Sequence, residues 1–255
     1  MNIFSFIFQE VLYRPLLNLL VFFYQLPYVD FGMAILFITI LSRILIWPLN
    51  SKMIKDQRKG QIKSQEIREK LKEVQEKYKG DAARQNEEVV KIWKKMKFNP
   101  LAGFAPMIIQ IIILIALYQV LRAVIQPEGL SLLYSFVPHP GEINPIFLRF
   151  LDLSKASPTL AILTGVIQYF YSKMSLALQP KISGKKKNRP MSGQERQMQT
   201  FQKIMQNQMI YFLPVMTVFI VWSLPAALSF YWFFSTLIGI LQQKMILKSY
   251  NTTNS

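Results

Sequence analysis

The chain has 255 residues, no cysteine and a single histidine, His139. The absence of cysteine excludes disulfides, thiolate catalysis and zinc or iron–sulfur sites built on cysteine. His139 lies in the turn-like stretch VPHPGE without a second candidate ligand cluster, which is typical of a loop histidine rather than a metal ligand. The sequence therefore predicts neither a metal nor a cofactor.

Acidic residues are also scarce, with 14 Asp and Glu against 30 Lys and Arg and a net charge of +16. Such a balance can indicate a nucleic-acid-binding protein. However, 51% of the residues are of hydrophobic type, the mean hydropathy is +0.23, and several apolar stretches approach 20 residues. Stretches of that length match a hydrocarbon core about 30 Å thick. The composition therefore indicates a multi-span membrane protein without nucleic acid as a direct ligand.

Five stretches are predicted to cross the membrane as helices. They are residues 31–49, 101–121, 159–179, 208–223 and 227–247. Most Lys and Arg residues lie in 51–99, in 173–205 and near the chain's end, and the positive-inside rule places these segments in the cytoplasm. The prediction is an all-α polytopic protein of the cell (inner or plasma) membrane, N-terminus out and C-terminus in, whose lysines also contact anionic lipid.

Residues 1–30 are harder to place. They are apolar, but Glu10, Arg14 and Pro15 interrupt them, and aromatic residues are abundant. This pattern favours an amphipathic helix lying in the membrane interface, and a true crossing stays open as the alternative.

The segments between the spans differ in character. Residues 50–100 are charged, and apolar residues at helical spacing predict a cytoplasmic helical hairpin that breaks at Gly80-Asp81. The apolar seam would use Ile67, Leu71, Val74, Tyr78, Val89, Trp93 and Met96. The hairpin either contacts a partner or lipid or serves as a passive linker. Residues 122–158 form an outer loop, 180–207 a basic cytoplasmic loop and 248–255 a cytoplasmic tail.

One charged residue, Arg43, lies inside the first predicted span, in LFITILSRILIWPLN. A charged side chain at the membrane centre costs roughly 2.5–3.5 kcal/mol on insertion scales. The predicted spans contain no Asp or Glu, so a salt bridge within them is excluded. Water, amides, hydroxyls or carbonyls must satisfy the guanidinium, which predicts a wet cavity open to the cytoplasm. The alternative is that Arg43 snorkels to the head groups.

Other polar side chains in the spans are candidates for the same cavity. Thr39 lies one turn before Arg43, Gln110 in the second span and Gln168 in the third. For the glutamines the alternative is a hydrogen bond between helices, worth about 0.6 kcal/mol on average.

Three stretches resemble the YidC-type membrane protein insertase family, whose members serve bacterial, mitochondrial and thylakoid membranes. They are ITILSRILIWPL, KFNPLAGFAPMIIQIIILIALYQVL and QMIYFLPVMTVFIVWSLPAALSFYWFFSTLIGILQQKMI. The resemblance covers roughly residues 11–248. Two positions depart from the family pattern: Ile112 stands where a proline is usual, and Trp232 replaces the second tyrosine of a pair.

The resemblance implies an insertase without covalent chemistry. Five spans would enclose a hydrophilic groove that receives the polar part of a nascent membrane protein. It implies substrate-groove positions at Thr39, Arg43, Gln110, Leu114, Tyr231 and Trp232, and the polar Gln168 of the third span is predicted to join them. The hairpin would recruit substrate, the basic loop and tail would contact the ribosome, and the protein would act either alone or with the Sec translocon.

Two other classes remain to be weighed. A small-solute transporter or channel would be expected to show an inverted repeat with paired polar sites, and no convincing repeat is present. A membrane enzyme would need a catalytic constellation, and the predicted spans offer no carboxylate, His or Cys.

Overall fold

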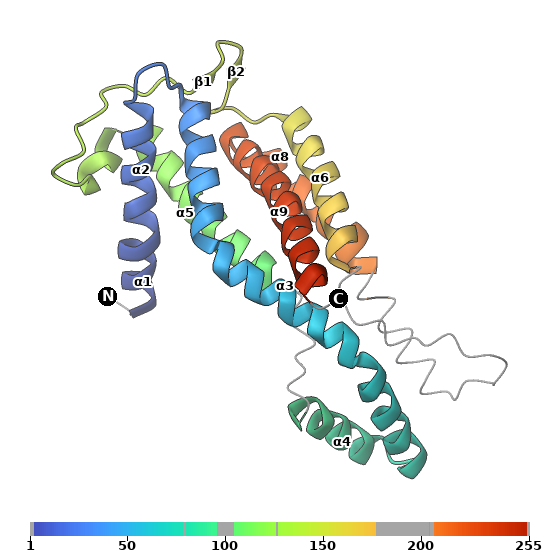
Figure 1. Ribbon diagram of the computed structural model, residues 1–255. Helices are drawn as coiled ribbons and strands as arrows, with labels where there is room; N and C mark the ends of the chain where they lie inside the picture. Colours follow the sequence, from blue (N-terminus) through green and yellow to red (C-terminus); the bar gives the residue numbers. More distant parts are fainter. Residues whose placement is uncertain are drawn as a thin grey trace.

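The computed structural model describes residues 3–78, 80–95, 105–125, 127–176, 204 and 207–253, and these are mostly helical (Figure 1). In chain order, the helices and strands are α1 (Ile3–Ile7), the π-helix η1 (Phe8–Tyr13), α2 (Arg14–Tyr24), α3 (Phe31–Lys77), α4 (Ala82–Lys95), α5 (Ala105–Ile125), the 3₁₀ helix η3 (Pro127–Leu132), β1 (Ile146–Phe147), β2 (Leu151–Asp152), α6 (Pro158–Leu176), the π-helix η4 (Gln208–Phe212), α8 (Leu213–Trp222) and α9 (Ala226–Thr253).

Helix α9 lies between α3 and α6, and α8 packs against α6. Helix α5 contacts α9 and the N-terminal helix, by which we mean α1, η1 and α2 together, residues Ile3–Tyr24. The buried apolar side chains belong mainly to one cluster, which joins α2, α3, α5 and α9. The helices thus form a bundle with α9 at its centre.

Every predicted span coincides with a helix of this bundle: the start of α3, α5, α6, η4 with α8, and α9. Residues 101–104 of the second span and 177–179 of the third lie outside the described residues. By length and apolarity, two described helical stretches could cross a membrane, Ser5–Tyr24 and Phe31–Asp56, and two shorter apolar ones are Ile108–Val124 and Ile210–Trp222. The number of crossings and their orientation stay predictions.

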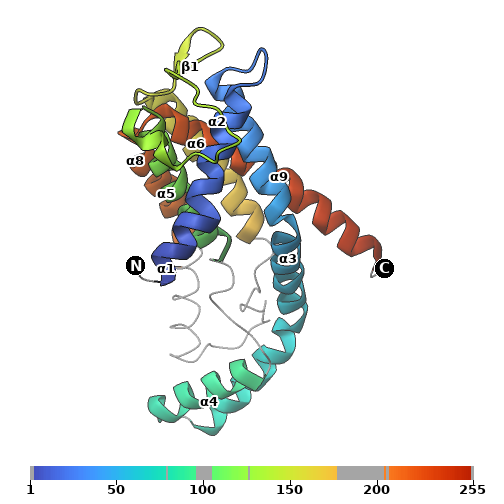
Figure 2. The ribbon, with the colours of Figure 1, turned by 90° about the vertical axis from the view of Figure 1, so that its left-hand side faces the viewer.

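Helix α3 begins at a defined cap and extends far beyond its apolar part. Asp30 accepts a hydrogen bond from the Met33 backbone N–H at 2.9 Å, the usual way to satisfy a helix N-terminus. The helix continues through Pro48 to Lys77, and Gly80, with a φ of +99°, turns the chain into α4. Figure 2 shows the charged half of α3 and helix α4 extending away from the bundle.

Helix α4 packs back on α3. The Gln85 side chain donates to the Tyr78 carbonyl at 2.7 Å across the turn, and Val89 is buried. Lys91 forms ion pairs with Glu87 and Glu88, and it lowers the pKa of Glu87. The side chains of Ile67, Leu71, Trp93 and Met96 lie outside the described residues, as does most of the basic loop 180–207.

A short antiparallel hairpin, β1–β2, lies over the end of the bundle where α3 begins and α8 meets α9. The ring of Phe147 contacts Phe230 with centroids 4.9 Å apart and occupies the space that a side chain at Gly32 would need. The backbone N–H groups of Ala226 and Ala227 donate to the Lys155 and Leu153 carbonyls. The outer loop is therefore tied to both α3 and α9.

The N-terminal helix packs into the bundle along one face. Leu16, Leu17, Leu20 and Val21 are buried against the main apolar cluster. Asn18 accepts a hydrogen bond from the Tyr134 backbone N–H at 2.6 Å and so joins this helix to the segment that follows η3. Its prediction as an interfacial helix concerns its place in the membrane and stays a prediction.

Candidate functional site

Arg43 is half-buried on α3, where it faces α5 and α9. Its Nε donates to the Ser235 hydroxyl at 2.8 Å, and its Nη2 donates to Gln110 Oε1 at 3.2 Å. The Ser235 hydroxyl in turn donates to the same Gln110 oxygen at 3.2 Å. We call these residues, together with Gln242, the arginine network. Neutral oxygens thus accept hydrogen bonds from two of the three guanidinium nitrogens of Arg43, for which the predicted spans contain no carboxylate.

Helix α9 presents one face to Arg43. Tyr231, Ser235, Gly239 and Gln242 follow each other at spacings of four, four and three residues, which brings them to the same side of a helix. Gln242 Nε2 donates to the Arg43 backbone carbonyl at 3.0 Å. The guanidinium lies against Gly239, where an added Cβ would come within 3.2 Å of Nη1. Side chain and backbone of Arg43 are thus both fixed by α9.

Apolar packing covers the arginine network on the side toward the outer loop. Tyr231 is 1% exposed and belongs to the main apolar cluster. Leu114 is buried one turn beyond Gln110, and Thr39 is fully buried with its hydroxyl donating to the Ile35 carbonyl of its own helix. Thr39 therefore contributes to the packed wall, and its hydroxyl is not directed to Arg43.

The network leaves hydrogen-bonding capacity unused. Gln110 Oε1 accepts twice, whereas its buried Nε2 has no partner among the described residues. Gln242 Oε1 is also buried without a described partner. Buried polar atoms without partners are costly, so such atoms often mark bound water or a ligand. No described acidic side chain forms an ion pair with Arg43, and a guanidinium stays charged at any physiological pH.

Two of the predicted groove residues lie elsewhere. Trp232 Nε1 donates to Gln168 Oε1 at 3.3 Å, and the Thr236 hydroxyl is 3.5 Å from the same oxygen. This glutamine cluster of Gln168, Trp232 and Thr236 joins α6 to α9, on a different face of α9 from the arginine network. The contacts match the alternative reading of Gln168 as an interhelical hydrogen bond.

Replacing Gln168 with leucine is expected to weaken the contact between α6 and α9 and to leave the arginine network intact. The loss of two acceptor contacts should lower the stability of the detergent-solubilised protein by about 1 kcal/mol, given about 0.6 kcal/mol per interhelical hydrogen bond. Thermal unfolding measures this effect, and Trp232→Phe, which removes one donor, should cost roughly half as much. Equal stability of all three proteins would show that the cluster contributes nothing.

Ser235, Gly239 and Gln242 were not among the predicted groove residues, although two of them directly contact the Arg43 side chain. Their spacing from Tyr231 was the available signal, because i+4 and i+8 positions share its face. Glycine in a helix costs about 1 kcal/mol relative to alanine, and that cost at Gly239 could have pointed to a close contact.

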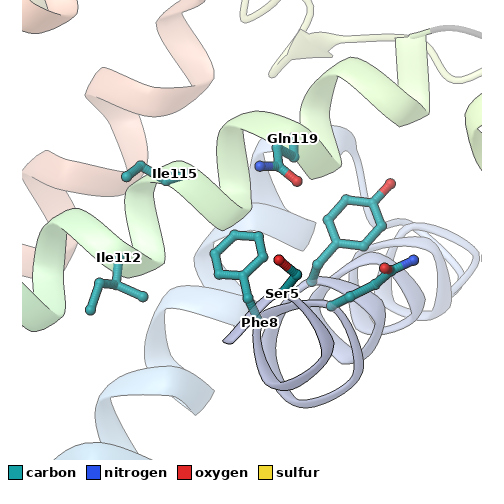
Figure 3. A pocket seen from close by; sticks show the side chains of 7 residues that line it. Ser5, Phe8, Ile112, Ile115 and Gln119 are labelled. Atoms are coloured by element: carbon teal, nitrogen blue, oxygen red, sulfur yellow. The ribbon is translucent and has the colours of Figure 1, made fainter. Parts of the chain in front are cut away.

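A cavity of about 480 Å³ lies on another side of α5, between that helix and the N-terminal helix (Figure 3). It is lined by Ser5, Phe8, Gln9, Tyr13, Ile112, Ile115 and Gln119. Ile112, the position at which the resembling family often has proline, is 38% exposed and lines this cavity, and it lies about 200° around the axis of α5 from Gln110. The isoleucine therefore does not alter the arginine network by direct contact.

Comparison with known proteins gives one consistent result. The sequence model of the family described as "60Kd inner membrane protein" matches residues 22–253. A protein named membrane protein insertase YidC from Syntrophus aciditrophicus is 33% identical over 92% of this chain and 36% of its own length. Proteins with the same name from Chlamydia trachomatis and Fusobacterium nucleatum are 29% and 28% identical, over 94% and 86% of this chain and 28% and 87% of their own lengths. The chain thus spans about a third of the first two relatives and most of the third.

Proposed function

The chain belongs to the 60Kd inner membrane protein family, and we propose that it is a membrane protein insertase and chaperone for nascent integral membrane proteins. It would act in the inner (plasma) membrane as a multi-pass protein. The names of its relatives support this activity, although it matches only part of the longer ones. The observation in the chain itself that carries the proposal is Arg43, a charge held among neutral side chains within an apolar helix bundle.

The arginine network suggests how such a protein would work. A polar or acidic segment of a client pays a high cost in hydrocarbon, because lipid offers its polar groups no partners. A groove that carries a positive charge and unused amide groups reduces that cost while the segment crosses. The client's apolar segment then moves into lipid. This step needs binding and release without covalent chemistry, so we propose no enzymatic activity.

Two features of the chain support further parts of the proposal. The basic cytoplasmic segments would meet lipid head groups and the ribosome, because positive charge attracts both. The hairpin of α3 and α4 extends from the bundle and would receive clients there. The Sec translocon is proposed as an additional partner on the resemblance alone. A small-solute transporter is the runner-up, but Arg43 has no symmetric counterpart within the described residues.

The activity can be tested in cells whose own insertase is depleted. We expect the chain to restore insertion of a single-span client that carries a short acidic N-terminal tail outside the membrane. Protease added to intact spheroplasts measures insertion, because only a translocated tail is cleaved. A client with a cleavable signal peptide and a large exported domain serves as control for general membrane damage. Failure to restore tail translocation, with the chain present in the membrane at normal amounts, would contradict the proposal.

A further inference from the structure

Gly239 occupies a special place in the arginine network. An added Cβ would lie 3.2 Å from Nη1 of Arg43, and 3.4 Å from both Cζ and Nη2. The first distance is tighter than ordinary contact, so any side chain would force the guanidinium to move by a few tenths of an ångström. Ser235 and Gln242 hold Arg43 from the turns on either side of Gly239. Gly239 thus leaves space for the guanidinium between Ser235 and Gln242, the two residues of α9 that hold Arg43.

The guanidinium has one nitrogen left for a client. Nε is bound to Ser235 and Nη2 to Gln110, whereas Nη1 donates to no acceptor among the described residues. Nη1 is also the nitrogen closest to the absent Cβ of Gly239. A side chain at this position would therefore displace the charge and cover its free donor at the same time.

We propose that Gly239 is a positioning residue for the client-binding charge: it lets the Arg43 guanidinium lie directly on α9 and keeps Nη1 free for an acceptor of the client. This role rests on the proposed insertase function. The acceptor would be a carboxylate, a backbone carbonyl or another oxygen, because guanidinium donates only. Gly239 then fixes where in the groove such an oxygen is received.

A competing explanation is that Gly239 only allows α3 and α9 to approach each other, as small residues commonly do in membranes. The two explanations differ in their dependence on residue 43. Lysine carries its charge on a single ammonium at the end of a flexible stem and lacks the planar fork that lies against Gly239. A side chain at position 239 should therefore disturb arginine at position 43 more than lysine.

The experiment is a double-mutant cycle with the insertion assay described above. Gly239→Ala and Gly239→Val are made in the chain with Arg43 and in the chain with Arg43→Lys. In the Arg43 chain, we expect alanine to lower insertion about threefold, the effect of one interhelical hydrogen bond, and valine to lower it further. In the Arg43→Lys chain, neither change should lower insertion beyond the level of Arg43→Lys alone.

Gly165→Ala is the matched packing control. An added Cβ there would overlap the Val218 side chain on α8, which makes no described hydrogen bond with the arginine network. Its effect should be the same with Arg43 and with lysine. Equal losses from the Gly239 variants in both backgrounds, or no loss with Arg43, would overturn the role of Gly239 alone. If the unmodified chain inserts no client, the proposed function and this role fall together.

Discussion

Replacing Arg43 with alanine is expected to reduce insertion of a client with an acidic N-terminal tail roughly tenfold, and Arg43→Lys is expected to keep most of it. A charged group at the membrane centre costs roughly 2.5–3.5 kcal/mol, and each 1.4 kcal/mol corresponds to a factor of ten in rate. The estimate assumes that Arg43 offsets about half of that cost while the tail crosses. Lysine keeps the charge, although it loses the two-sided hydrogen bonding to Ser235 and Gln110.

The client supplies the decisive control for this prediction. When the acidic residues of the tail are changed to asparagine or glutamine, the difference between Arg43 and Arg43→Ala should shrink, because the charge pair is gone. Arg122→Ala offers a matched control on the protein, since Arg122 is an exposed arginine at the other end of α5. Protease protection measures all combinations. Equal insertion by Arg43→Ala and the parent would mean that Arg43 only snorkels toward the head groups.

The sequence was sufficient to identify Arg43 but not its surroundings. A charge in an apolar run without any carboxylate to pair with is visible from the residues alone. That Gln110 and Ser235 would both meet the guanidinium depends on how three helices are rotated about their axes. Gln110 was a candidate both as a polar residue of the second span and through the family resemblance, whereas Ser235 was not among the predicted groove residues. Helix rotation is set by packing across the whole bundle, and local sequence carries little information about it.

Tyr231 and Trp232 show the same limit more clearly. Neighbouring residues in a helix are separated by about 100° around its axis, since a turn takes 3.6 residues. The adjacent aromatic residues therefore contact different helices: Tyr231 lies near Arg43, whereas Trp232 bonds to Gln168 on α6. The family resemblance assigns both residues to one groove, and their contacts with different helices follow from packing that the sequence does not show.

The helices themselves were easier to predict. Apolar stretches bounded by charge or proline mark their positions, and each predicted span lies on a helix. The N-terminal helix is different, because its buried face is the same whether it packs on lipid or on protein. Leu16, Leu17 and Leu20 would be apolar in either case, and their burial against α3 and α5 could not be derived from the pattern.

The position of the N-terminal helix in the membrane leads to the second large expected effect. Figure 1 shows α2 beside α3, joined by a short loop at the end where the outer hairpin lies. Near the opposite end of the helix, Ser5 and Phe8 line a cavity with Ile112 of α5, only two residues from Gln110. The beginning of the N-terminal helix therefore lies close to the level of Arg43. The packing favours a helix that enters the membrane over one that lies flat on its surface.

Because the chain has no cysteine, a single cysteine can be introduced at Ile7, Tyr28 or Ile44 and labelled with a nitroxide. The depth of each label in vesicle membranes is measured from its collisions with oxygen and with a water-soluble nickel complex. All three side chains are exposed, and Ile44 adjoins Arg43 and provides the reference depth. From Tyr24 to Ile7 an α-helix rises roughly 25 Å, most of a hydrocarbon core about 30 Å thick. We expect the label at position 7 to lie at a depth close to that at position 44, and the label at position 28 to lie at the surface. Equal depths of the labels at positions 7 and 28 would instead establish an interfacial helix. The contact of the N-terminal helix with α5 would then be confined to the outer face of the membrane. An inserted helix would give the bundle one more crossing, and the cavity between it and α5 would lie within the membrane, on a different face of α5 from the arginine network.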